Sequence, residues 1–199
     1  MKVYLLSLAR LVILGAFMFS ACTEAEDPDI SDKEYYVKFK AGGVEKKFDM
    51  LPNTLASFAY FDDFGVYGCT ITGFKQGSDG TKDFINIQMW NETLFQPSQT
   101  YRLQEGIMVN AVQMSRMIVG YFDQDGVGYL ASLLKDRYPT LNINDDAQVR
   151  FTEIDPTFVK GTFTAKTYEA HATVITNKKE VLITDGEFFL PRADATNYK

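Results

Sequence analysis

Histidine and cysteine are scarce in this chain of 199 residues, which has one histidine and two cysteines. Zinc centres and nucleophilic triads generally depend on imidazole, and His171 is the only imidazole available. We therefore expect neither a zinc enzyme nor a serine triad. A catalytic pair of Cys69 and His171 is the alternative that this composition leaves, and we expect both residues to be structural instead.

Clusters of basic residues are also missing. The longest basic runs are Lys46-Lys47 and Lys178-Lys179, and the formal net charge of the chain is −6. Nucleic-acid binding relies on Lys and Arg side chains that replace the counterions of the phosphates. This charge pattern argues against DNA or RNA as a partner.

Only one long hydrophobic run occurs, at residues 3–19, where two polar residues interrupt it. Lys2 precedes the run, and the small residues Ser20 and Ala21 follow it. This layout predicts a secretory signal. A transmembrane anchor is the alternative, but Arg10 within the run would cost about 2.5–3.5 kcal/mol at the centre of a bilayer.

The end of this run, Phe19-Ser20-Ala21-Cys22, resembles the lipobox of bacterial lipoproteins, although that family usually has Leu where Phe19 stands. The resemblance implies cleavage before Cys22 and a diacylglyceryl group on its sulfur. Two acyl chains are enough for stable membrane anchoring. We therefore predict a signal peptide at residues 1–21 and lipidation at Cys22, with ordinary secretory cleavage after Ala21 as the alternative.

Residues 22–33 are acidic and lack aromatic side chains, a composition typical of a solvated tether. Acidic residues this close to the lipobox cysteine resemble the surface-export signal of Bacteroidota-type lipoproteins. The expected location is therefore the outer membrane, with display at the cell surface. Cleavage removes 21 residues and two of the 20 basic side chains, which leaves 178 residues with a charge of about −8. We expect residues 34–199 to form a single domain.

Cys69 has no partner for a disulfide within the chain if Cys22 carries lipid. It alternates with Tyr67 and Ile71 in a segment that has the pattern of a strand. Free cysteine on an apolar strand face behaves as a small hydrophobic residue. We therefore predict that Cys69 lies in the core.

Short segments of alternating polar and apolar residues recur from residue 35 onward, separated by turn-forming clusters. The first, residues 35–50, alternates on both sides of Gly42-Gly43, as in a hairpin with a tight primed turn. The other predicted strands are residues 57–61, 66–74, 83–90, 108–122, 126–132, 147–154, 158–170 and 180–191. This spacing predicts an all-β fold, an antiparallel β-sandwich or open barrel.

Helical periodicity is confined to residues 129–139, where Leu130, Leu133 and Leu134 cluster before Pro139. We therefore expect at most one short helix. The lipobox, the acidic tether and the all-β pattern are together similar to uncharacterised Bacteroidota-type β-sandwich lipoproteins. That resemblance implies a location and a fold but no particular reaction.

Glu153-Ile154-Asp155 resembles the start of the E-I-D-x-E core of certain β-sandwich glycoside hydrolases, in which alternate acids point into the cleft. Here Thr157 and Phe158 stand where the second glutamate would fall, and Pro156 interrupts the strand that should present it. We expect these acids to lie on a solvated strand end.

Acidic turns offer candidate calcium ligands, since calcium prefers hard oxygen donors. The candidates are Asp123 and Asp125 in the turn D-Q-D-G. Asp also favours turns because its side chain accepts hydrogen bonds from nearby backbone N–H groups. We expect this local role, and no other cofactor.

Trp90 is the only tryptophan, and it ends a segment with two different faces. Ile85, Ile87 and Met89 share one face, which leaves Phe84, Asn86, Gln88 and Trp90 on the other. Aromatic rings beside amides suit sugars, whose apolar faces stack on an indole while their hydroxyls exchange hydrogen bonds. The alternative is that Trp90 covers a sheet face beneath a loop. Two further residues could extend a binding surface, namely Tyr60 and Phe64.

Three classes of function follow from these observations. The first is a lipid-anchored, non-catalytic binding or accessory protein with a glycan as ligand. The second is a structural partner of an outer-membrane protein complex, docked through a strand edge or an apolar patch. The third is an enzyme similar to a glycoside hydrolase with an unusual site.

Overall fold

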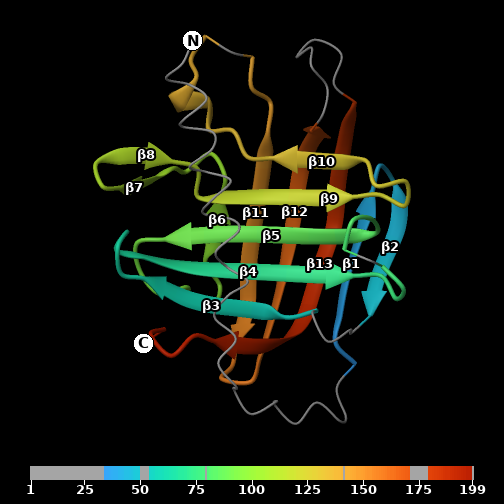
Figure 1. The fold of residues 1–199 in the computed structure, drawn as a ribbon, viewed down its shortest axis with the longest axis horizontal. Helices are drawn as coiled ribbons and strands as arrows, with labels where there is room; N and C mark the ends of the chain where they lie inside the picture. The colour runs from blue at the N-terminus through green and yellow to red at the C-terminus, as the bar shows by residue number, and fades with distance from the viewer. Residues whose placement is uncertain (1–33, 50–53, 79, 141, 171–178, 199) are drawn as a thin grey trace.

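The computed structural model describes residues 34–49, 54–78, 80–140, 142–170 and 179–198, and the fold of this part is all-β (Figure 1). It contains an 11-stranded sheet and a two-stranded sheet, with a 3-10 turn at Lys135–Arg137. The prediction of an all-β, sandwich-like fold is thus confirmed.

The large sheet folds back on itself into two layers. The front layer contains β3 (Ala56–Phe61), β4 (Val66–Phe74), β5 (Phe84–Asn91), β9 (Met117–Phe122) and β10 (Gly128–Ala131). The rear layer contains β2 (Val44–Asp49), β1 (Tyr36–Ala41), β13 (Glu180–Asp194), β12 (Phe158–Glu169), β11 (Asp146–Ile154) and β6 (Thr100–Arg102). In Figure 1 the strands of the two layers cross at a steep angle.

Two long strands connect the layers. The end of β12 pairs with β10, and the end of β13 runs parallel to β3, whereas the other described strand pairs are antiparallel. Between these contacts β12 and β13 pair with each other, with an irregularity between Phe163 and Ala165. Such an irregularity bends a strand and increases its twist. The extra residue lies on β13, where Asp185 has a φ of +52°, so the bulge bends β13 within its pairing with β1 and β12.

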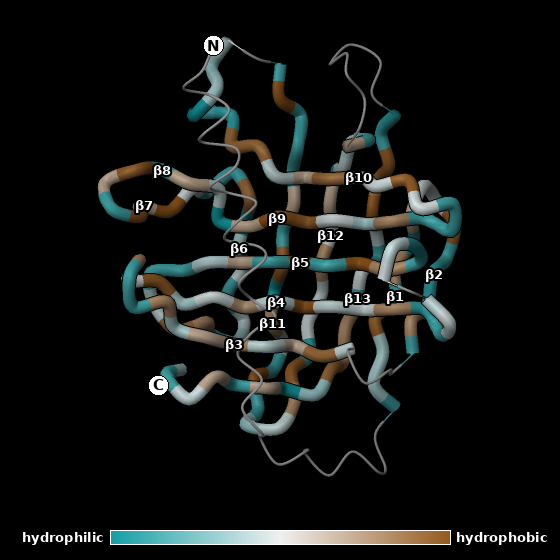
Figure 2. The backbone as a smooth tube through the Cα atoms, viewed as in Figure 1, coloured by the Kyte–Doolittle hydropathy of each residue, from teal (hydrophilic) through white to brown (hydrophobic). Residues whose placement is uncertain are grey.

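The core lies between the layers, because residues alternate along each strand between an inward and an outward face. Figure 2 shows this alternation of hydrophobic and hydrophilic residues along the strands. The inward residues Ile85, Ile87 and Met89 of β5 are fully buried. Cys69 on β4 is fully buried in the same cluster, which confirms its predicted place in the core.

The first predicted hairpin is confirmed, since β1 and β2 pair around Gly42 and Gly43 with φ angles of +56° and +84°. Two positive φ angles define the primed turn that suits the twist of a hairpin.

One other segment differs from expectation. Residues 108–122 form the end of β7 (Ile107–Val109), then β8 (Val112–Met114) and β9, because the chain turns at Asn110 and Ala111 with positive φ. The predicted strand at residues 126–132 is β10, and the 3-10 turn that follows it is within the expected limit of one short helix.

Candidate functional site

The outward face of the front layer is built from registered rows of side chains. One row joins Ser57, Thr70, Gln88 and Ile118 across β3, β4, β5 and β9. The next row joins Thr72, Asn86 and Gly120. Two groups of large aromatic side chains flank these rows, one around Trp90 and one around Phe84. We call the band of Ser57, Thr70, Thr72, Asn86 and Gln88 the polar band.

The five strands of the front layer contain no Lys, Arg, Asp or Glu. The rear layer differs sharply, because its outward face carries ion pairs such as Lys38–Glu187 at 2.9 Å and Lys40–Asp185 at 2.8 Å. A charged face of this kind is an ordinary solvated sheet surface. The front layer therefore presents a face of another kind, partly exposed to solvent and without formal charge.

Several hydrogen-bonding groups of the polar band have no partner in the part of the chain that the structure describes. The Thr70 hydroxyl is buried without a hydrogen bond, and none reaches the Ser57 hydroxyl or the Gln88 amide. Asn86 is different, since its Nδ2 donates to Oγ1 of Thr72 at 3.1 Å. The Ser57 hydroxyl and the Gln88 amide thus lie in one row as unpaired neutral groups, and the Thr70 hydroxyl between them is buried.

Trp90 lies on the same outward face, as predicted from the alternation, and is partly buried. It packs against a cluster of Val66, Ile107 and Val109, where β7 and β8 cross the end of the front layer. No hydrogen bond joins its indole N–H to any residue in the described ranges. The hairpin therefore supports the indole on one side, and the indole N–H is unpaired within these ranges.

Phe84 lies on this face but does not offer a free ring. Its ring stacks on Phe122 with centroids 4.4 Å apart and planes 8° apart, and on Phe74 at 5.6 Å and 25°. A ring held between two others cannot stack on a ligand as well. Phe84 therefore forms a packed aromatic border of the polar band.

The structure separates the two additional aromatic candidates. Phe64 packs against the same cluster as Trp90. Tyr60 lies within β3, and its ring contacts Tyr67, with centroids 4.7 Å apart, on the inward side of the layer. Tyr67 itself packs against the main core. Tyr60 and Trp90 therefore lie on opposite faces.

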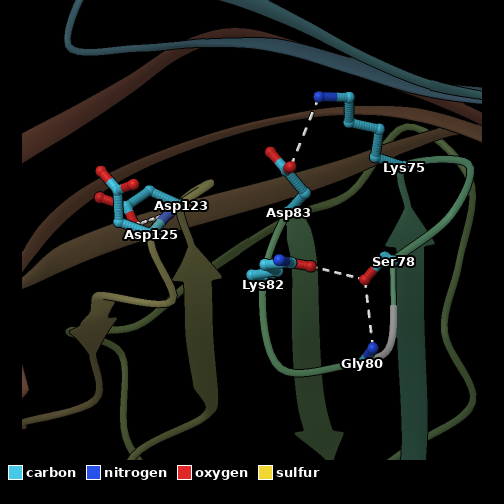
Figure 3. A network of polar contacts seen from close by, with 7 residues as sticks. All are labelled: Lys75, Ser78, Gly80, Lys82, Asp83, Asp123 and Asp125. Atoms are coloured by element: carbon cyan, nitrogen blue, oxygen red, sulfur yellow. Dashed lines mark hydrogen bonds and ion pairs between the residues drawn. The ribbon is translucent and has the colours of Figure 1, made fainter.

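The calcium candidates Asp123 and Asp125 lie in the turn between β9 and β10 (Figure 3). Oδ1 of Asp123 accepts hydrogen bonds from the backbone N–H groups of Asp125 and Val127, at 3.0 and 2.9 Å. The nearby Asp83 pairs with Lys75 at 3.4 Å. Within the described ranges no three His, Cys, Asp or Glu side chains gather in a way that could hold a metal ion. The geometry shows the turn-capping role of Asp123.

The other acidic candidates make local contacts. Glu153 pairs with Lys160 across β11 and β12 at 2.9 Å, and Oδ1 of Asp155 accepts from the backbone N–H of Thr157 at 2.8 Å. In Cys69 burial raises the pKa of the thiol well above its ordinary value, so the nucleophilic thiolate is disfavoured. These groups do not converge on the polar band.

Three predicted features fall outside the described residues: Cys22 with its lipobox, the acidic tether, and His171. Within the described ranges, no helix combines the length and apolar character that crossing a bilayer requires.

Three residues of β3 and β4 were not among the candidates predicted from the sequence, namely Ser57, Thr70 and Thr72. The composition does distinguish this face, because the segments at residues 56–61, 66–74 and 84–91 contain no charged residue, whereas 23% of the residues of the chain are charged. No family model, curated protein or solved structure matches the chain.

Proposed function

We propose that this protein is a lipid-anchored binding module at the surface of the outer membrane, and that the polar band with Trp90 is its glycan-binding face. One observation carries the binding proposal. The Ser57 hydroxyl and the Gln88 amide lie in one row, on either side of Thr70, and neither has a hydrogen-bond partner in the part of the chain that the structure describes.

These groups match the chemistry of sugars. A sugar ring has several hydroxyls, each both a donor and an acceptor, and amide and hydroxyl side chains can serve both roles. The indole of Trp90 adds an apolar surface and an N–H donor beside the row, since Trp90 pairs with Gly68 on β4. A Cβ on Gly68 would overlap the ring of Phe61, so this ring lies over Gly68, and Phe61 packs against the same cluster as Trp90.

The anchoring part of the proposal depends on the sequence. The hydrophobic run ends at Phe19-Ser20-Ala21-Cys22, the pattern that resembles a lipobox, and an acidic segment follows it directly. A diacylglyceryl group would hold the domain permanently at a membrane. A binding face without charge on a permanently anchored domain suits retention of an extracellular polymer.

Fluorescence of Trp90 tests the binding proposal, since the chain has one tryptophan. The full-length protein in a polyoxyethylene detergent, which contains no sugar, is titrated with a panel of polysaccharides in the presence of acrylamide. We expect at least one polysaccharide to protect the indole from quenching. Gln88→Ala should weaken this binding, whereas Gln148→Ala on the rear layer should leave it unchanged. Equal binding by both variants would remove the polar band as the site.

Membrane fractionation tests the anchor. Wild-type protein should sediment with membranes, and Cys22→Ala should not enter the lipidation pathway. Metabolic labelling with a fatty acid provides a second readout, because it reports the covalent lipid directly. A Cys22→Ala protein that still carries the label would contradict the proposal.

A second candidate function is docking to an outer-membrane protein. One observation favours it, because the β7–β8 hairpin exposes Met108 and Val112, which are 54% and 49% accessible. Exposed apolar residues at the tip of a hairpin suit a protein contact. Met108→Ser with Val112→Ser should abolish in-cell crosslinking to a partner and leave glycan binding intact if this function holds.

A further inference from the structure

We infer that the ligand of this face is a neutral glycan rather than an acidic one, an inference that rests on the proposed function and specifies its ligand class. The argument starts from charge. A carboxylate or sulfate that loses water on binding requires a cation or several N–H donors as compensation, and an uncompensated charge is costly to bury. The five strands that form this face contain no Lys or Arg.

Nearby cations do not supply the missing charge. Arg116, between β8 and β9, lies at the Trp90 end of the face, because its backbone oxygen accepts a hydrogen bond from the backbone N–H of Trp90 at 2.8 Å. Its guanidinium is already engaged, because Nη1 donates to Oδ1 of Asn91 and Nε donates to the carbonyl of Glu105 at 2.9 Å. At the other end Lys75 pairs with Asp83, and Lys82 lies outside the strands, in the exposed turn between β4 and β5.

The net charge of the protein also disfavours an acidic glycan. The chain carries a formal charge of −6, and a protein with net negative charge repels a polyanion before contact. An acidic glycan would therefore meet repulsion at a distance and no compensation at the face. A neutral glycan meets neither cost.

The groups that are present favour hydroxyls. Ser57 on β3 and Gln88 on β5 offer neutral donors and acceptors on either side of Thr70, and adjacent strands lie roughly 5 Å apart. The row from β3 to β5 therefore spans roughly 10 Å, and the indole of Trp90 flanks it. Several hydroxyls of an extended neutral chain can thus exchange hydrogen bonds with one row.

The experiment compares polysaccharides that differ only in charge. Each neutral polysaccharide of a panel is paired with its own derivative in which primary alcohols are oxidised to carboxylates. Binding to the full-length protein in polyoxyethylene detergent is followed through Trp90 fluorescence at low and high salt. We expect a neutral member to bind with an affinity that salt does not change, and its oxidised partner to bind at least about tenfold more weakly.

A charge-introducing variant sharpens the test. Gln88→Lys should reduce the preference for the neutral polysaccharide and make binding of the oxidised one salt-dependent, whereas Gln148→Lys on the rear layer should do neither. Equal or tighter binding of oxidised members by the wild-type protein would overturn the neutral-glycan inference and leave the proposed function standing. Failure of every polysaccharide, neutral or oxidised, to bind would overturn the proposed glycan-binding function itself.

Discussion

Asn86 on β5 donates a hydrogen bond from Nδ2 to Oγ1 of Thr72 on β4, at 3.1 Å. Thr70, two residues before Thr72 on the same face, has a buried hydroxyl without a hydrogen bond in the described part of the chain. Two threonines on one strand face thus differ in a single contact. The satisfied pair is part of the fold, whereas the Thr70 hydroxyl is buried and reaches neither solvent nor a hydrogen-bond partner in this part of the chain.

This difference gives opposite expectations for two similar substitutions. Thr72→Val should lower the free energy of unfolding by about 1 kcal/mol, because it removes the acceptor of Asn86. Thr70→Val should be neutral or stabilising, since it replaces a buried unsatisfied hydroxyl with a methyl group of the same shape. Chemical denaturation measures both, and a larger loss for Thr70→Val would show that this hydroxyl has a structural role. Glycan affinity should be unchanged in Thr70→Val, because the buried hydroxyl does not reach a ligand.

Gly161 on β12 should not tolerate a side chain. A Cβ placed there would lie 2.5 Å from the backbone oxygen of Arg150 and would also overlap the ring of Phe188. Gly161→Ala should therefore reduce stability by roughly 1–3 kcal/mol or more through overpacking. Gly120→Ala is the matched control, because its nearest neighbour is the flexible end of Leu130 at 3.3 Å. Thermal denaturation should show the larger decrease for Gly161→Ala; equal decreases would contradict this account.

Ala111 at the tip of the β7–β8 hairpin adopts a φ of +63°, in the left-handed region that disfavours a Cβ. Ala111→Gly should raise the stability of the hairpin by roughly 0.5–1 kcal/mol. Asn110→Gly should have a smaller effect, because asparagine tolerates its φ of +48°. Hydrogen exchange of the β7 and β8 amides reports the change, and faster exchange in Ala111→Gly would refute it.

The thiol of Cys69 should not react with an alkylating reagent in the folded protein. Its side chain is fully buried, and burial raises the pKa of its thiol well above the ordinary value. In the Cys22→Ala variant, which has one cysteine, an alkylating reagent should therefore label Cys69 only in denaturant. Labelling of the native protein at the rate of the unfolded protein would contradict the position of Cys69 in the core.

Tyrosine ionisation should weaken the fold in strong alkali. Burial, with a further contribution from the charge of Asp123, raises the pKa of Tyr121 to about 12 from an ordinary value of 10.0. Between these values the unfolded chain loses the proton and the folded protein keeps it, so stability falls as the pH rises from 10 toward 12. Alkaline denaturation curves should be less steep for Tyr121→Phe; unchanged curves would argue against this linkage.

The alternation in the sequence was sufficient to place side chains on faces. Ile85, Ile87 and Met89 are buried and Trp90 lies on the other face, as predicted, because successive residues of a strand point to opposite sides whatever its neighbours are. The Gly42-Gly43 turn could also be predicted from the sequence, since glycine locally favours the positive φ angles of a two-residue hairpin turn.

Neighbours across the sheet could not be read in the same way. Thr70 and Gln88 form a row only because β4 and β5 pair in one register, and a slip of one residue would turn every side chain to the opposite face. The stack around Phe84 and the hairpin beside Trp90 likewise depend on residues distant in sequence.

The sequence by itself determined an all-β chain, the inward and outward residues of its main strands, and the core position of Cys69, because these depend on local periodicity and burial preference. Only the tertiary structure decided that an uncharged polar band crosses β3, β4 and β5, that Phe84 is enclosed between two rings, and that Tyr60 faces away from Trp90. These relationships depend on strand register and layer packing, which are set by contacts between segments far apart in the chain.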